Sequence, residues 1–260
     1  MSIVPTAGAL ALVALLLSDP AIAQIADTGQ QNPEVLRGNG QIRDWANQVV
    51  DFVRGPLDYA DPSLGLASFG SPEDCLGENG TPVSLGDGGS ITLGFPLAIE
   101  NGPGVDFVVF ENAFAFGGEV FAELAFVEVS SDGVTFVRMP AISRIDRALG
   151  AFDGITSDET YDLAGNFVGG TGFDLDDLAS APEVLSGAVD LDFVRYVRVV
   201  DVIGDCTNDA SFDALGNAVC DPYPTTSASG GFDLTGVAIM NPPGPVDVAP
   251  TSFGAVKSRF

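Results

Sequence analysis

Short stretches of alternating apolar and polar residues, separated by turns rich in Gly and Asp, recur from residue 83 onward. Residues 90–95 place three apolar side chains on one face, which is the two-residue period of a strand with one buried side. Residues 106–110 are almost continuously apolar, as expected of a central strand covered on both faces. By the same reasoning we expect further strands at 121–130, 134–138, 193–201 and 232–240.

One pair of these strands carries a turn signal of its own. Asp132-Gly133 stands between two β-rich runs. Asp-Gly is favoured in two-residue type I′ turns because both central residues of such a turn need positive φ. The sequence therefore predicts a tight hairpin at this point.

The segment 41–54 is ambiguous. Ile42, Trp45, Val49 and Phe52 recur at helical spacing, while the run of apolar residues near its end suits a strand equally well. Elsewhere the chain shows no regular alternation of strands with long helices. We predict an all-β fold, an antiparallel β-sandwich (jelly roll) with long loops and at most one or two short helices. The 18 Phe residues are expected mostly in its core and not on a stacking platform.

The first 23 residues have the features of a secretory signal peptide. Residues 9–17 form an apolar run too short to span a bilayer, and the small residues at 21–23 predict cleavage before Gln24. The stretch before the run has no Lys or Arg, and a buried helix is the alternative. We therefore expect secretion to the periplasm, the medium or the cell surface. The domains expected are 1–23 signal peptide, 24–44 N-terminal extension, 45–242 β-sandwich and 243–260 C-terminal tail.

Charge and composition exclude several kinds of chemistry. The chain has no His, which rules out Ser-His-Asp and Cys-His catalysis and His-ligated zinc. Its formal net charge of −26 repels nucleic acid and anionic lipid, and no segment after the leader suggests membrane insertion. The same charge attracts divalent cations, although it is also explained by solubility alone.

The three cysteines are too few for a disulfide scaffold. In an exported chain Cys206 and Cys220 are expected to form a disulfide that closes a local loop. Cys75 is then unpaired, either buried or available for an intermolecular bond.

The loop between these cysteines belongs to an acidic stretch, residues 204–226. Calcium takes six to eight hard oxygen ligands, which Asp and Asn side chains on a Gly-containing loop supply. The spacing does not match the EF-hand, and a solvated loop with Asp and Asn in turns is the alternative. The predicted calcium ligands are Asp205, Asn208, Asp209, Asp213 and Asp221.

A second candidate site directly follows the apolar strand at 106–110. A carboxylate buried without a partner is costly, so Glu111 must be bonded to turn amides, paired with Arg or bound to a ligand. Glu111 and Asn112 are therefore predicted as ligand-binding residues, with purely structural satisfaction as the alternative.

Three stretches resemble the galactose-binding-like, discoidin-type jelly rolls: LGLASFGSP (64–72) leading into VSLGDGGSITLGF, FVEVSSDGVTF (126–136) and RYVRVV (195–200). More narrowly, DFVVFENAF, DPYPT and GGFDL are similar to segments of an uncharacterised family of exported bacterial cell-surface proteins. The likeness covers roughly residues 45–242. It implies a jelly roll, carbohydrate as the ligand class, and a structural calcium.

Together these observations predict an exported, calcium-stabilised β-sandwich that acts as a binding or surface-adhesion module. One alternative is a polysaccharide-active enzyme that uses carboxylates, because glycosidases need only a pair of them. The chain has so many acids that the presence of a pair carries no information. The other alternative is a structural protein of the envelope or matrix.

Overall fold

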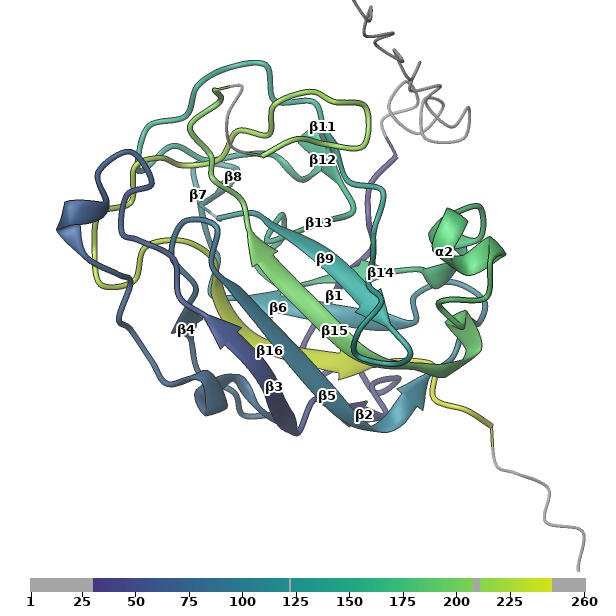
Figure 1. The fold of residues 1–260 in the computed structure, drawn as a ribbon. Coiled ribbons are helices and arrows are strands. Elements are labelled where there is room, and N and C mark those ends of the chain that lie inside the picture. The colour runs from purple at the N-terminus through teal and green to yellow at the C-terminus, as the bar shows by residue number, and fades with distance from the viewer. Residues whose placement is uncertain (1–29, 122, 208–210, 245–260) are drawn as a thin grey trace, which may run out of the picture.

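The computed structural model describes residues 30–121, 123–207 and 211–244. The predicted signal peptide and most of the predicted tail lie outside these residues. Within them, the structure confirms an all-β antiparallel sandwich (Figure 1). No helix in these ranges is long and apolar enough to cross a membrane.

The described strands form two six-stranded sheets. The first sheet has the order β1 (Glu34–Val35), β14 (Gly170–Phe173), β6 (Phe107–Glu111), β16 (Asp233–Ile239) and β2 (Asp44–Trp45), with β4 (Val83–Ser84) also paired to β16. The second has the order β10 (Val137–Arg138), β9 (Ala125–Ser130), β15 (Val194–Asp201), β5 (Ser90–Ile99) and β3 (Gln48–Val53), with β13 (Leu163–Ala164) also paired to β9. Strands β7 (Phe114–Phe116) and β8 (Glu119–Phe121) form a separate hairpin, and β11 (Ile142–Ser143) pairs with β12 (Thr160–Tyr161).

Within the described ranges, helical structure is confined to short pieces. The α-helix α2 (Pro182–Leu185) is a single turn. The 3₁₀ turns are Pro62–Leu64, Pro72–Cys75, Ser157–Glu159, Leu175–Leu178 and Leu191–Phe193. Asp174 caps the fourth of them by accepting from the Asp176 backbone N–H at 3.0 Å.

The main core lies between the two sheets. Alternate residues of β5, β9 and β15 face alternate residues of β6 and β16, and both sets are buried. Phe107 and Phe173 stack here with ring centroids 5.1 Å apart. Each such side chain contributes about 1.5–3 kcal/mol when fully buried, so this layer dominates the stability of the sandwich.

Strand β6 is buried at all five positions, as its apolar run predicts. Its outward residues are covered because Trp45 packs on Phe110 with centroids 5.3 Å apart. The Arg37 guanidinium lies over both rings, 4.9 and 4.6 Å from their centroids. The ambiguous segment 41–54 forms strands β2 and β3 and not a helix. Strand β1 lies within residues 24–44, the predicted N-terminal extension.

A second core covers the far end of β9. It is formed by residues of β9, of the long connection that follows β10 and of the segment that follows β15. Its members include Phe126, Ile155, Val202 and Val219. The acidic stretch thus packs against the sandwich over part of its length and is not wholly solvated.

The predicted two-residue turn at Asp132-Gly133 is wrong, although the hairpin exists. Val129 pairs with Val137, and residues 131–136 form a wider loop. The Asp132 side chain accepts from the backbone N–H groups of Val134 and Thr135, both at 2.8 Å. These side-chain hydrogen bonds stabilise the wider loop, in which Gly133 has φ +76°.

Candidate functional site

The acidic stretch contains the predicted disulfide. Cys206 and Cys220 are bonded, with Cα atoms 4.8 Å apart. An isolated bridge between Asp205 and Cys220 holds the two arms of the loop together beside it. The loop is therefore closed as the cysteine spacing indicates.

Of the five predicted calcium ligands, the structure describes Asp205, Asp213 and Asp221. Asp205 accepts from the Thr207 backbone and hydroxyl at 2.9 and 2.5 Å, which is a local turn. Asp213 accepts from four N–H donors at 2.8–3.2 Å, three backbone groups and the Asn217 side chain. Asn208 and Asp209 lie outside the described residues. Asp205 thus accepts bonds within its own turn, and Asp213 accepts from its own turn and from Ser143 of β11.

Asp221 is different, because it is buried beside acids from distant parts of the chain. We define the carboxylate cluster as Asp87, Glu111, Glu123, Asp201, Asp221 and Asp233. Five of them are between 2 and 9 % exposed, and Asp233 is partly buried. Two predicted residues from separate candidate sites, Glu111 and Asp221, thus meet in one place.

The two sheets position the cluster at one end of the sandwich (Figure 1). Glu111 ends β6 and is paired with Leu234 of β16, one residue after Asp233. Asp201 ends β15 opposite Ala125, two residues after Glu123. Asp87 lies in the turn before β5. The strand ends of both sheets therefore carry the acids to the same edge.

Most of these carboxylates accept a hydrogen bond from at least one backbone N–H group. Asp201 accepts from Phe232 and Gly88 at 2.6 and 2.9 Å. Glu123 accepts from Gly231 at 3.0 Å, and Asp221 accepts from Leu124 at 2.9 Å. Further bonds run from Tyr59 N–H to Asp87 at 2.6 Å, from the Ser84 hydroxyl to Asp233, from Asn112 N–H to Glu111 and from the Thr225 hydroxyl to Glu123.

Glu111 is the exception, since its Oε2 is buried and has no hydrogen-bond partner. Asn112, predicted with it, is exposed and joins the site only through its backbone N–H, which also reaches Asp233 O at 3.0 Å. Glu111 therefore lies within the cluster and the Asn112 side chain is exposed, and ligand binding by either residue stays a prediction.

The surroundings of the cluster destabilise the ionised form of its carboxyl groups. Burial, followed by the neighbouring carboxylates, raises the pKa of Glu111, Asp201 and Asp221 well above the usual range. Burial raises the pKa of Asp87 and of Asp233 to about 6. No Arg or Lys in the described residues lowers the pKa of any member. Among the same residues, no three acidic side chains converge in a finished coordination shell.

A surface of exposed aromatic rings lies directly beside the cluster. Hairpin β7–β8 occupies residues between Glu111 and Glu123, so cluster acids stand at both of its ends. We define the aromatic surface as Phe114, Phe116, Phe121 and Phe152. The rings form a row with centroid separations of 6.3, 4.9 and 6.3 Å.

Backbone pairing supports this surface in spite of its exposure. The hairpin turn is Gly117-Gly118, with φ of +61° and +95°, as a two-residue turn of the primed type requires. Val120 exchanges both backbone hydrogen bonds with Ile155, at 2.8 and 2.9 Å. That pairing brings Phe152 to the row, where it is 83 % exposed.

The expectation that Phe is mostly a core residue is not met in the described residues. Six Phe side chains are buried and six are exposed. The buried set is Phe95, Phe107, Phe110, Phe126, Phe173 and Phe232. The exposed set is Phe69, Phe114, Phe116, Phe152, Phe193 and Phe212.

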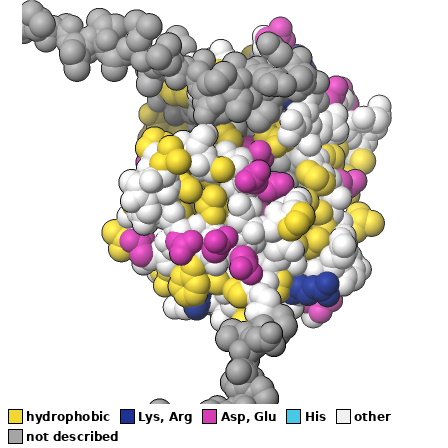
Figure 2. Space-filling view, turned by 90° about the vertical axis from the view of Figure 1, so that its right-hand side faces the viewer, with side chains coloured by type: hydrophobic (Ala, Val, Ile, Leu, Met, Phe, Trp, Pro, Cys, Tyr) yellow, Lys and Arg dark blue, Asp and Glu magenta, His cyan; other side chains and the backbone are white. Residues whose placement is uncertain are grey.

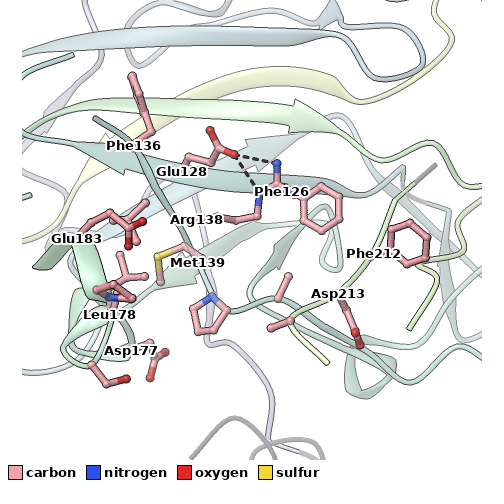
Figure 3. Close-up of a pocket in the computed structure, with 17 residues that line it drawn as sticks. Phe126, Glu128, Phe136, Arg138, Met139, Asp177, Leu178, Glu183, Phe212 and Asp213 are labelled. Carbon is pink, nitrogen blue, oxygen red and sulfur yellow. Dashed lines mark hydrogen bonds and ion pairs between the residues drawn. The ribbon is translucent and has the colours of Figure 1, made fainter. Parts of the chain in front are cut away.

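A groove of about 600 Å³ lies elsewhere, on the outer side of β9 and β10 (Figure 3). Phe126, Phe136 and Phe212 line it together with several acids. Glu128 is ion-paired with Arg138 at 2.8 Å and with Arg198 at 3.1 Å. Because Glu128 is held by two arginines and Asp213 by its own turn, two of the groove's acids are already engaged.

No protein-family model matches this sequence, and no curated protein matches it.

The formal net charge of −26 gives the protein a negative electrostatic field that extends beyond its surface. Acidic side chains gather across the middle of the face in Figure 2, whereas Lys and Arg appear mainly near its lower edge. At long range this charge repels anions and attracts cations.

Sequence reasoning missed most of the two sites just described. Only Glu111 and Asp221 of the cluster were among the predicted site residues. For the hairpin, Gly117-Gly118 between two Phe-containing runs is a recognisable turn signal. No local signal marks the convergence of the acids, since it depends on strand pairing.

Proposed function

We propose that the protein is an exported β-sandwich binding or surface-adhesion module that takes neutral carbohydrate on its aromatic surface. The observation that carries this proposal is the row of four Phe rings on β7–β8 and the adjoining loop, three of them exposed by 42 to 83 %. Contiguous exposed apolar surface of this kind marks an interaction site. Export rests on the predicted signal peptide.

The chemistry of the surface suits a sugar. A pyranose ring presents a face of C–H groups, which packs on the electron-rich face of an aromatic ring. The net charge of −26 does not oppose a neutral ligand, whereas it repels a second copy of the chain. The resemblance to galactose-binding-like domains points to the same ligand class.

Catalysis has less support in the geometry. A glycosidase needs two free carboxylates facing a substrate. In the groove of Figure 3, Glu128 is bound by two arginines and Asp213 is satisfied in its turn. These engagements favour binding over hydrolysis as the role of the outer surface.

Direct binding measurements on the full chain test the proposal. Dextran, a galactan, a mannan and a β-glucan are offered in affinity electrophoresis, and any binder is followed by calorimetry. Phe114→Ala and Phe152→Ala should each weaken binding about tenfold, or about 1.4 kcal/mol, which lies within the range of aromatic contacts. Their melting temperatures should stay close to that of the wild type, because the rings are exposed.

Phe193→Ala is the matched control, since Phe193 is 48 % exposed and lies outside the row. It should bind as the wild type does. Failure to bind any neutral polysaccharide contradicts the proposal, as does equal weakening by the control. A change of oligomeric state in Phe114→Ala would point instead to an assembly surface.

A further inference from the structure

We propose that the carboxylate cluster is a divalent-cation site, best suited to calcium, in which Glu111, Glu123, Asp201 and Asp221 hold the ion. This places the calcium at the end of the sandwich and not in the loop between the cysteines. It does not depend on carbohydrate binding.

The first argument is uncompensated charge. Six acids from six separate segments lie between the sheets or at their edge, and their partners in the described residues are backbone N–H groups and hydroxyls. The ion pairs of Arg138, Arg147 and Arg198 go to Glu128 and Glu159, outside the cluster. Buried like charges are costly unless a cation joins them or protons neutralise them.

The second argument is an unused ligand atom. Glu111 is 9 % exposed, and its buried Oε2 has no hydrogen-bond partner. In addition to burial, the charges of Asp233 and Asp221 act on Glu111 and raise its pKa, and Glu111 acts likewise on Glu123. A buried polar atom without a partner usually indicates a missing water or ion, and here the surrounding groups are all acceptors.

The third argument concerns the kind of ion. Oxygen-only donors select hard cations. No three His, Cys, Asp or Glu side chains of the described residues are placed to hold an ion as they stand, so the proposal requires the carboxylates to move toward it. Calcium tolerates irregular shells of six to eight oxygens, including bidentate carboxylates, whereas magnesium demands near-octahedral geometry and keeps its waters.

The backbone approaches one of the proposed ligands closely. Gly204 packs so closely on the Asp221 carboxylate that a Cβ atom there would overlap it. An ion in the cluster joins the ends of β6 and β15, one from each sheet. It also fixes both ends of hairpin β7–β8, because Glu111 precedes the hairpin and Glu123 follows it.

Thermal unfolding of the chelator-treated full chain tests the inference, with no sugar present. Calcium at one hundred times its dissociation constant should raise the melting temperature by about 5–10 °C. Magnesium should raise it much less, and sodium chloride at matched ionic strength less still. Calorimetry on the wild type should give saturable binding of one calcium ion.

Variants locate the ion. Glu111→Gln and Asp221→Asn should each remove most of the calcium shift. Asp213→Asn, in the acidic loop, should keep it, and so should Glu183→Gln, which makes the same charge change at a distant position. Retention of the shift in the first pair together with its loss in Asp213→Asn would return the ion to the loop.

The competing state is one in which the buried acids share protons and bind no metal. In that case Glu111→Gln and Asp221→Asn stabilise the protein at neutral pH, and calcium acts as sodium does. That result, or the absence of saturable binding to wild-type protein, overturns the inference. If a variant does not fold, wild-type calorimetry and the Asp213→Asn comparison still decide it.

Discussion

At the scale of single residues, Cys75 shows how burial limits chemistry. Its side chain is fully buried under the turn Pro72–Cys75, and its Sγ lies 3.2 Å from Pro72 O. Burial raises the pKa of this thiol to about 12. The sequence left open whether Cys75 is buried or free for an intermolecular bond, and the structure shows that it is buried.

We therefore expect Cys75 to resist alkylation in the native protein. Iodoacetamide at pH 8 should leave it unmodified over hours, since the reactive thiolate is nearly absent and out of reach. The same treatment after unfolding in guanidinium should modify it fully, as peptide mass spectrometry will show. Rapid native modification, or a dimer linked through Cys75, would contradict this expectation.

At the scale of elements, the disulfide between Cys206 and Cys220 is a local prediction that the structure confirms. The cysteines pair as expected, and Asp205 and Asp213 beside them are used in turns. Asp221 follows Cys220 directly and lies in the cluster. The crosslink therefore fixes where the chain enters the cluster.

The double substitution Cys206→Ser and Cys220→Ser should destabilise the protein. Opening a loop of this length costs about 3 kcal/mol in the chain-entropy account, and lowers the melting temperature by about 6–12 °C. Denaturant unfolding without reductant measures the difference. Wild type with reductant is the control and should match the variant; a variant as stable as the oxidised wild type would show that the loop is held by its packing alone.

At the scale of the whole molecule, buried acids outside the cluster give stability an unusual dependence on pH. Burial raises the pKa of Asp106, which accepts from Gly102, Leu175 and the Asn241 side chain at 2.7–2.8 Å. Burial also raises that of Asp162, which accepts from the Asn32 side chain at 2.9 Å. Exposed Asp132 has a lowered pKa and acts in the opposite direction.

For a carboxyl group whose folded pKa exceeds its unfolded pKa, the folded state binds more protons between the two values. The free energy of unfolding then falls as pH rises from the unfolded pKa, about 3.9 for Asp, through the folded one. Chelator-treated protein should therefore be more stable at pH 4.5 than at pH 7.5, as measured by urea unfolding. Asp106→Asn should lessen this slope, while Glu183→Gln should not. A stability that increases over this range would contradict the assignment.

Much of the architecture is readable from local pattern. The apolar runs at 90–95, 106–110 and 193–201 appear as β5, β6 and β15, because strand periodicity is a property of neighbouring residues. The disulfide is readable for the same reason. Where local rules compete, as in 41–54 and at Asp132-Gly133, pairing with β5 and the Asp132 side-chain bonds decide the outcome.

The sequence by itself determined the class of fold, the strands and the crosslink, since each depends on short-range spacing and composition. Only the tertiary structure decided which acids meet. Glu111 and Asp221 are far apart in the chain; Glu111 ends β6, and Asp221 is held by the backbone N–H of Leu124, directly before β9 of the other sheet. The pairing of strands distant in sequence brings these acids together. Such pairing produces no periodic pattern in the sequence around either residue.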